Sequence, residues 1–126
     1  MYAVKISNNG GSAFNITSDN YKFTIDNKGG GITPPSALLA ALGSCVGVYI
    51  KKYSDGAGLA INSFEIDVHS DLSKKSPYRF ETITINIGLK GAALDDRRKK
   101  ALLEFVKNCP VHNTILGNPA INCVLT

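Results

Sequence analysis

The sequence lacks a long hydrophobic run, a cysteine-rich framework and a secretory start. Its longest apolar stretch, residues 37–50, is too short and too rich in Gly and Ser to span a bilayer. Three cysteines in 126 residues are too few for a disulfide scaffold and fit a reducing compartment. The first residues show no basic, apolar and small-residue succession of a signal peptide. We therefore expect a cytoplasmic protein that does not bind a membrane.

Charge is also sparse and scattered. Asp, Glu, Lys and Arg make up 19% of the residues, and the net charge of +4 comes from short clusters, of which residues 97–100 form the longest. Nucleic-acid binding needs cations that converge on one surface together with aromatic side chains for base stacking. These clusters lie next to Tyr, Ser or Asp instead, so we interpret them as solvated faces and expect no nucleic-acid partner.

No linker or internal repeat divides the chain, and its length suits one domain, which we expect to cover residues 1–126. The glycine run at residues 29–31 is not followed by the Lys-Ser/Thr of a phosphate-binding loop. We interpret this run as a hinge.

Alternating apolar and polar residues predict a meander of three antiparallel strands at residues 2–6, 13–17 and 21–25. A long helix is expected over residues 35–55, because Thr33 precedes two prolines that suit a helix start. The later elements expected are strands at 63–71 and 79–89, a helix from Asp95 to about 108, a short helix at 110–116 and a strand at 120–125. The order β-β-β-α-β-β-α-α-β predicts an α+β fold of antiparallel sheets around a long central helix.

Cys45 lies in the middle of the long predicted helix among small residues, including Gly43 and Gly47. A glycine inside a helix costs about 1 kcal/mol relative to alanine, so two of them suggest close packing against another helix or access to the thiol. An inert buried thiol is an equally good interpretation, because free cysteine is among the most buried residue types.

Cys109 precedes Pro110, which suits the first position of a helix, so Cys109 is expected to be the N-cap. A helix N-terminus favours a thiolate, and we therefore predict a lowered pKa for Cys109. Cys45, apolar and in mid-helix, should have a raised pKa, which makes Cys109 the more acidic thiol in our hypothesis. Only the fold could bring these two sulfurs together. Cys123 is expected to be a buried strand residue.

Two segments resemble the cysteine signatures of the OsmC/Ohr proteins, the osmotically inducible and organic-hydroperoxide-resistance family. They are residues 34–45, Pro-Pro-Ser-Ala-Leu-Leu-Ala-Ala-Leu-Gly-Ser-Cys, and residues 109–115, Cys-Pro-Val-His-Asn-Thr-Ile. The predicted order of strands and helices is similar to that family along nearly the whole chain.

The resemblance implies an OsmC-like fold, an intertwined homodimer and a thiol-dependent reductase of organic hydroperoxides that serves in oxidative-stress defence. Cys45 would attack the peroxide as the peroxidatic cysteine and become a sulfenic acid. Cys109 would resolve it as an intrachain disulfide, and an external dithiol would reduce that bond. No metal and no organic cofactor is implied.

The sequence departs from the family at the residues that activate the first thiol. Family peroxidases use an arginine from the N-terminal region and a glutamate near the start of the long helix. This chain has no arginine before Arg79 and no glutamate before Glu65, and neither Lys22 nor Lys28 supplies the fixed fork of a guanidinium. An alternative function is therefore a catalytically weak scaffold that binds a small apolar or electrophilic ligand at the dimer interface.

Each of the other candidate site residues has both a functional and a structural interpretation. Cys109 and His112 have a ligand-like spacing and would need further ligands from Cys45, Cys123 or His69 to form a zinc site. His112 is otherwise expected at a helix surface or an interface, and His69 on the strand face opposite Val68. Tyr49 either lines a pocket one helical turn beyond Cys45 or packs in the core.

Overall fold

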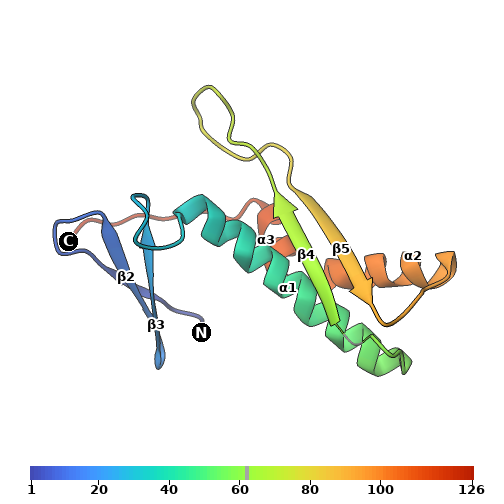
Figure 1. Ribbon diagram of the computed structural model, residues 1–126. Helices are drawn as coiled ribbons and strands as arrows, with labels where there is room; N and C mark the ends of the chain where they lie inside the picture. The colour runs from blue at the N-terminus through green and yellow to red at the C-terminus, as the bar shows by residue number, and fades with distance from the viewer. Residues whose placement is uncertain (62) are drawn as a thin grey trace. The chain divides into compact units, whose positions relative to one another are not determined.

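Three short strands, β1 (Lys5–Ser7), β2 (Ala13–Ser18) and β3 (Tyr21–Asp26), open the chain and form an antiparallel meander (Figure 1). In the computed structural model, which describes residues 1–61 and 63–126, Ile16 of β2 lies opposite Ile6 and Phe23. Ile16 is buried, whereas Ile6 and Phe23 are each 52% exposed. The meander predicted from the sequence is confirmed, and by itself it leaves apolar side chains in water.

The glycine run after β3 forms a closed turn. The N–H of Asp26 donates to the carbonyl of Ile32 at 3.0 Å, and its Oδ1 accepts from the N–H of Lys28 at 2.8 Å. Gly29 has a φ of +94°, which an L side chain rarely adopts. These bonds tie both ends of the turn together, so the interpretation of this run as a hinge is replaced by that of a closed turn.

The long helix α1 (Pro34–Ala57) confirms the prediction within two residues at either end. Thr33 Oγ1 accepts a hydrogen bond from the N–H of Ser36 at 3.4 Å, as a helix-starting hydroxyl does. At the other end Gly58 has a φ of +65°, and the N–H of Leu59 donates to the carbonyl of Ser54. The chain forms two compact units, Met1–Ala40 and Ala41–Thr126, and α1 begins in the first and continues in the second.

Two antiparallel strands, β4 (Ser63–His69) and β5 (Thr84–Lys90), follow and lie beside α1 (Figure 1). The glycines of α1 permit this contact. A methyl group on Gly43 would come within 2.8 Å of Val68 Cγ2, and one on Gly47 within 3.3 Å of Phe64 Cε2. Close packing around Cys45 was thus predicted correctly, but within the second unit the neighbour is a strand and not another helix.

The core of the second unit lies between α1, the two strands and the helix α2 (Asp96–Phe105). Asp95 caps α2 by accepting a hydrogen bond from the N–H of Arg98 at 2.8 Å. A short 3-10 turn, η1 (Val106–Asn108), connects α2 to α3 (Pro110–Gly117). The buried apolar cluster consists of Leu42, Val46, Ile50, Leu102 and Val106. Residues 97–100 are exposed on α2, which confirms their interpretation as a solvated face.

Three sequence-based predictions are wrong: the start of the strand at 79–89, the strand at 120–125 and the burial of Cys123. The strand expected at 79–89 begins only at Thr84, because the preceding residues belong to a loop joined by an isolated bridge between Leu72 and Phe80. Residues 118–126 form no strand, and Cys123 is exposed. The alternation of apolar and polar residues in this segment is typical of a strand. A strand also needs hydrogen bonds to the edge of a neighbouring strand, and none of the described strands pairs with this segment.

Among the helices formed by the described residues, none has the length and apolar character needed to cross a membrane.

Candidate functional site

Cys45 lies near the middle of α1 and is partly buried. Its neighbours Gly43 and Gly47 face β4, which holds this part of the helix against the sheet. Leu42 and Val46, on either side of Cys45 along the helix, are both buried in the core. The backbone at Cys45 is therefore held by packing, while its thiol keeps some access to the surroundings.

Cys109 lies where η1 ends and α3 begins, and it is fully buried. Its N–H donates to the carbonyl of Val106 at 3.2 Å, and its carbonyl accepts from the N–H of Asn113 at 3.0 Å. Its Sγ accepts a hydrogen bond from the N–H of His112 at 3.4 Å. The sequence-based prediction that Cys109 is the N-cap of a helix with Pro110 in its first turn is confirmed.

The fold brings the two cysteines together although 64 positions separate them in the sequence. The side chains of Cys45 and Cys109 are within hydrogen-bonding reach of each other, and both are free thiols. They come from different elements, α1 and the N-terminus of α3, so only tertiary packing sets their approach.

Burial raises the pKa of the Cys109 thiol, because a thiolate loses its hydration there. The hydrogen bond with Cys45 and the repulsion from a Cys45 thiolate raise the pKa further. The N–H groups of His112 and Val111 act in the opposite direction but do not compensate. The prediction of a lowered pKa for Cys109 is therefore wrong, and the hypothesis that Cys109 is the more acidic thiol loses its basis.

These properties give the two thiols different chemical abilities. A protonated Cys109 can donate its S–H to the sulfur of Cys45, so it can act as the hydrogen-bond partner of a Cys45 thiolate. Cys45 is the more accessible of the pair, because Cys109 has no exposed surface. The arrangement suits attack by Cys45 on an oxidant followed by disulfide formation with Cys109.

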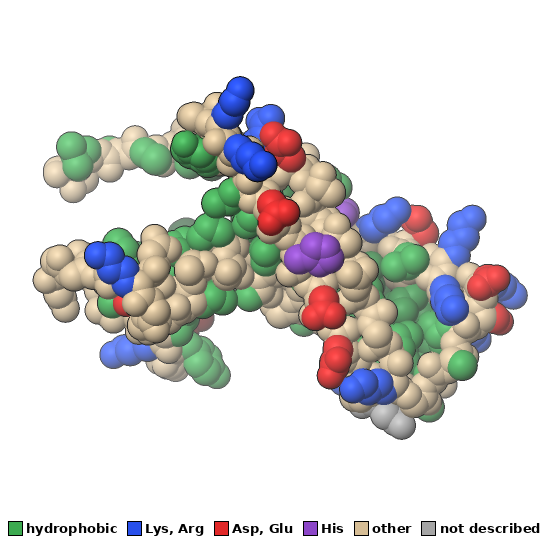
Figure 2. Space-filling view, turned by 45° about the horizontal axis from the view of Figure 1, so that its top comes forward, with side chains coloured by type: hydrophobic (Ala, Val, Ile, Leu, Met, Phe, Trp, Pro, Cys, Tyr) green, Lys and Arg blue, Asp and Glu red, His purple; other side chains and the backbone are tan. Residues whose placement is uncertain are grey.

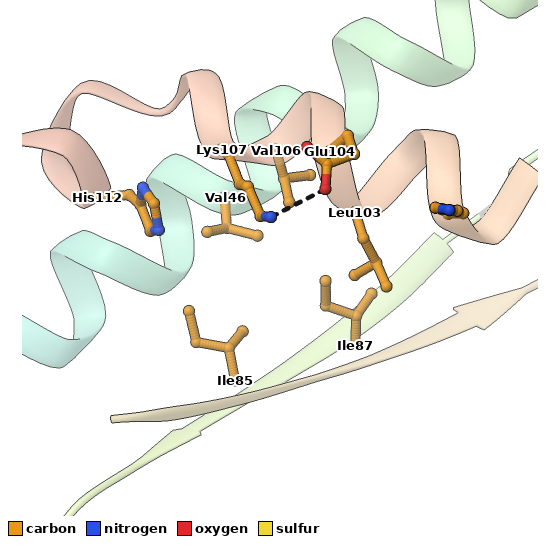
Figure 3. Close-up of a pocket in the computed structure, with 9 residues that line it drawn as sticks. Val46, Ile85, Ile87, Leu103, Glu104, Val106, Lys107 and His112 are labelled. Atoms are coloured by element: carbon orange, nitrogen blue, oxygen red, sulfur yellow. Dashed lines mark hydrogen bonds and ion pairs between the residues drawn. The ribbon is translucent and has the colours of Figure 1, made fainter. Parts of the chain in front are cut away.

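A cavity of about 520 Å³ is lined by Val46, the residue that follows Cys45 in the sequence, and by His112 (Figure 3). Neither cysteine lines it. Ile85 and Ile87 of β5 form apolar walls of this cavity, which we call the lysine cavity because Lys100 and Lys107 also line it.

One ion pair lies at the edge of the lysine cavity. Lys107 Nζ is 2.9 Å from Glu104 Oε1, and both side chains are more than half exposed. Sequence reasoning missed this pair; the signal was the i, i+3 spacing of Glu104 and Lys107 just before Cys109. This exposed ion pair joins α2 to η1.

Two other candidates, Tyr49 and His69, lie against the core and at the surface, respectively. Tyr49 packs against the ring of Phe105, with centroids 5.9 Å apart, which favours the core interpretation. His69 is exposed on β4, as predicted. Within residues 1–61 and 63–126, no three His, Cys, Asp or Glu side chains come together in a way that could hold a metal ion.

The chain as a whole is similar to known proteins. A model of the OsmC-like protein family matches residues 26–124. A hydroperoxide reductase from Mycoplasma genitalium is 31% identical over 127 residues, which cover 94% of this chain and 90% of that protein.

Solved structures show the same fold at lower identity. An OsmC-like protein from Mycoplasma pneumoniae has a TM-score of 0.83 at 23% identity, covering 93% of this chain and 88% of its own. An organic hydroperoxide resistance protein OsmC from Legionella pneumophila has a TM-score of 0.68 at 17% identity, with coverages of 94% and 90%. These likenesses confirm the α+β architecture expected from the sequence.

Proposed function

Because this chain belongs to the OsmC-like family, we propose that it is a thiol-dependent reductase of organic hydroperoxides, with Cys45 peroxidatic and Cys109 resolving. The relative from Mycoplasma genitalium named hydroperoxide reductase supports this activity at the level of the family. Three free cysteines suit a reducing compartment, so we infer a cytoplasmic role in oxidative-stress defence.

The reaction consumes one hydroperoxide and one dithiol. The Cys45 thiolate attacks the outer peroxide oxygen, the O–O bond breaks, and with one proton the products are a Cys45 sulfenic acid and an alcohol. The Cys109 thiol then attacks the sulfenic sulfur, forming an intrachain disulfide and releasing water. An external dithiol reduces this disulfide and is itself oxidised to a disulfide.

One observation carries the proposal: the accessible Cys45 and the buried Cys109 share a hydrogen-bonding contact across two elements. The raised pKa of Cys109 keeps its proton in place before oxidation, so Cys109 can stabilise a Cys45 thiolate as a donor.

A second candidate function, a catalytically weak scaffold that binds a small apolar ligand, is favoured by the cavities. The lysine cavity has apolar walls and is large enough for a small organic molecule. A scaffold would retain ligand when Cys45 is replaced by serine, whereas an enzyme would lose turnover.

The experiment that tests the proposal is intact-mass analysis with peptide mapping. Reduced protein is exposed briefly to cumene hydroperoxide or to hydrogen peroxide. We expect rapid loss of two hydrogens, mapped to a bond between Cys45 and Cys109. Cys123→Ser should behave in the same way, because Cys123 lies outside the pair. Unchanged thiols at a large peroxide excess would exclude the reductase and favour the scaffold.

We also propose that residues 1–126 act as one domain within an intertwined homodimer. The family match at residues 26–124 crosses the boundary between the two units, which supports a single functional domain. Apolar side chains are exposed in each unit, among them Phe23 at 52% and Val48 at 49%, as expected for a chain that associates with a copy of itself.

The assembly is tested by sedimentation of the wild type and of Val48→Glu. We expect a dimer for the wild type and a weaker dimer for the variant, because a charge would be buried in an apolar interface. Lys51→Glu, an exposed change near the end of the same helix, is the matched control for added negative charge. A monomeric wild type at micromolar concentration would contradict the proposal.

A further inference from the structure

Two neighbouring cavities in the second unit share a wall. Besides the lysine cavity, a cavity of about 370 Å³ is lined by Glu81 and is called here the glutamate cavity. Ile85 and His112 line both. Figure 3 shows His112 at one end of the lysine cavity, across from Ile85, with Leu103 toward the other end. The side chains of His112 and Ile85 therefore form the boundary between the two spaces.

The two cavities differ in charge. Lys100 and Lys107 line the lysine cavity, and Glu104 neutralises Lys107 across 2.9 Å. Lys100 forms no ion pair with any residue that the structure describes, so the lysine cavity keeps one uncompensated positive charge. The acidic side chain of the glutamate cavity is Glu81. Figure 2 shows hydrophobic side chains lying among charged ones at the end of the second unit that carries α2.

The shared wall lies next to the cysteine pair. Val46 lines the lysine cavity and Leu42 the glutamate cavity, and Cys45 lies between them along α1. The N–H of His112 donates to the sulfur of Cys109. The main chain of His112 thus belongs to the setting of the resolving thiol, while its side chain divides the space beside it.

We propose that the side chain of His112 determines which organic groups the site accepts, because it keeps the two cavities apart. This inference rests on the proposed function. A hydroperoxide with a short apolar group fits within one cavity, whereas a long alkyl chain that extends from one cavity into the other meets the ring of His112. Differences of one methylene already change specificity by about tenfold or more in well-shaped pockets, so opening the wall should have a large effect.

The test compares tert-butyl hydroperoxide with linear octyl hydroperoxide. His112→Ala removes the ring but keeps the N–H that reaches Cys109, so the setting of the resolving thiol is retained. We expect the ratio of kcat/KM for the octyl over the tert-butyl substrate to rise by roughly tenfold. His112→Gln, which keeps a side chain of similar length, should stay near the wild-type ratio. An unchanged ratio in His112→Ala would overturn the proposal.

Two further variants control for volume and folding. Leu116→Ala enlarges the glutamate cavity without touching the wall, and its ratio should change much less than that of His112→Ala. Ile85→Ala opens the same wall from β5 and should raise the ratio in the same direction. If His112→Ala does not fold, Ile85→Ala decides: a ratio equal to that of Leu116→Ala would contradict the partition.

Binding separates this inference from the proposed reaction. Cys45→Ser removes the thiol proposed to react with peroxide. In that variant, binding can be measured apart from the reaction, with octanol as the probe, by calorimetry or NMR. We expect His112→Ala to bind octanol roughly tenfold more tightly than the protein with His112. Tighter binding without any hydroperoxide turnover in the parent protein would support the partition and exclude the reductase. Equal affinities would overturn the partition.

Discussion

Cys45 and Cys109 are chemically identical side chains in opposite settings. Cys45 lies in the middle of a helix with partial exposure, whereas Cys109 caps a helix N-terminus and has no exposed surface. Helix geometry alone would make Cys109 the more acidic thiol. The structure raises the pKa of Cys109 instead, with burial as the largest cause.

The comparison shows which effect dominates when a helix end is buried. A helix terminus stabilises a nearby charge by about 0.3–1 kcal/mol, or about 2 kcal/mol in favourable partly buried positions. At Cys109 burial is the largest of the causes that raise the pKa, and the hydrogen bonds from the N–H groups of His112 and Val111, which lower it, do not compensate. Desolvation therefore outweighs the helix end, and a motif such as Cys-Pro predicts the cap but not the ionisation.

Serine substitutions of the cysteines should have the largest effects on turnover. Cys45→Ser removes the thiol that we propose attacks the peroxide, so turnover of cumene hydroperoxide with a dithiol should fall by about a thousandfold or more. Cys109→Ser should still undergo the first oxidation and accumulate a sulfenic acid, which dimedone labelling followed by mass spectrometry would detect. Cys123→Ser should retain turnover. Equal turnover in Cys45→Ser and the wild type would refute the assigned roles.

Alkylation should rank the thiols by burial. Iodoacetamide should modify Cys123 and Cys45 first, and Cys109 roughly a hundredfold more slowly, because a buried thiol reacts only after local opening. Peptide mapping over time measures the three rates. Faster modification of Cys109 than of Cys45 would restore the hypothesis that the helix end makes Cys109 acidic.

The stability of the protein at alkaline pH should depend on the raised pKa of Cys109. The pKa of Cys109 is higher in the native state than in the unfolded chain, so the native state retains a proton that the unfolded chain releases. This stabilisation is complete below the unfolded pKa, near about pH 8.5, and is lost as pH rises through the native pKa. The free energy of unfolding of the wild type should fall more steeply above that pH than that of Cys109→Ala. Denaturant titrations at several pH values measure the difference, and parallel curves would contradict it.

The glycines beside Cys45 should give the smallest effects. Alanine gains about 1 kcal/mol over glycine in a helix interior, while overpacking costs about 1–3 kcal/mol. Gly43→Ala should therefore destabilise the protein by up to about 2 kcal/mol through its contact with Val68, and Gly47→Ala should be nearly neutral. Gly56→Ala, with no atom within 4 Å of the added methyl group, should stabilise by up to about 1 kcal/mol and serves as the control. Thermal unfolding measures the stabilities of the three variants. A Gly43→Ala protein as stable as Gly56→Ala would show that β4 can move to accommodate the added methyl group.

Local signals in the sequence predicted most of the elements. Thr33 with two prolines indicated the start of α1, Asp95 that of α2, and Pro110 that of α3, and each helix begins within about one residue of the prediction. These signals succeed because a cap and a proline act through hydrogen bonds and dihedral angles of nearby residues. The strand predicted at 120–125 failed because its alternation depends on a partner edge that lies elsewhere.

What the sequence by itself determined is the order of the elements as far as α3, the cap at Cys109 and the position of Cys45 within a long helix lined by small residues. Only the tertiary structure decided that the two sulfurs interact, that Cys109 retains its proton, and that His112 and Ile85 separate two cavities. The physical reason is that caps and periodicity act over a few neighbouring residues. Desolvation and cavity shape depend instead on groups that packing brings together from distant parts of the chain.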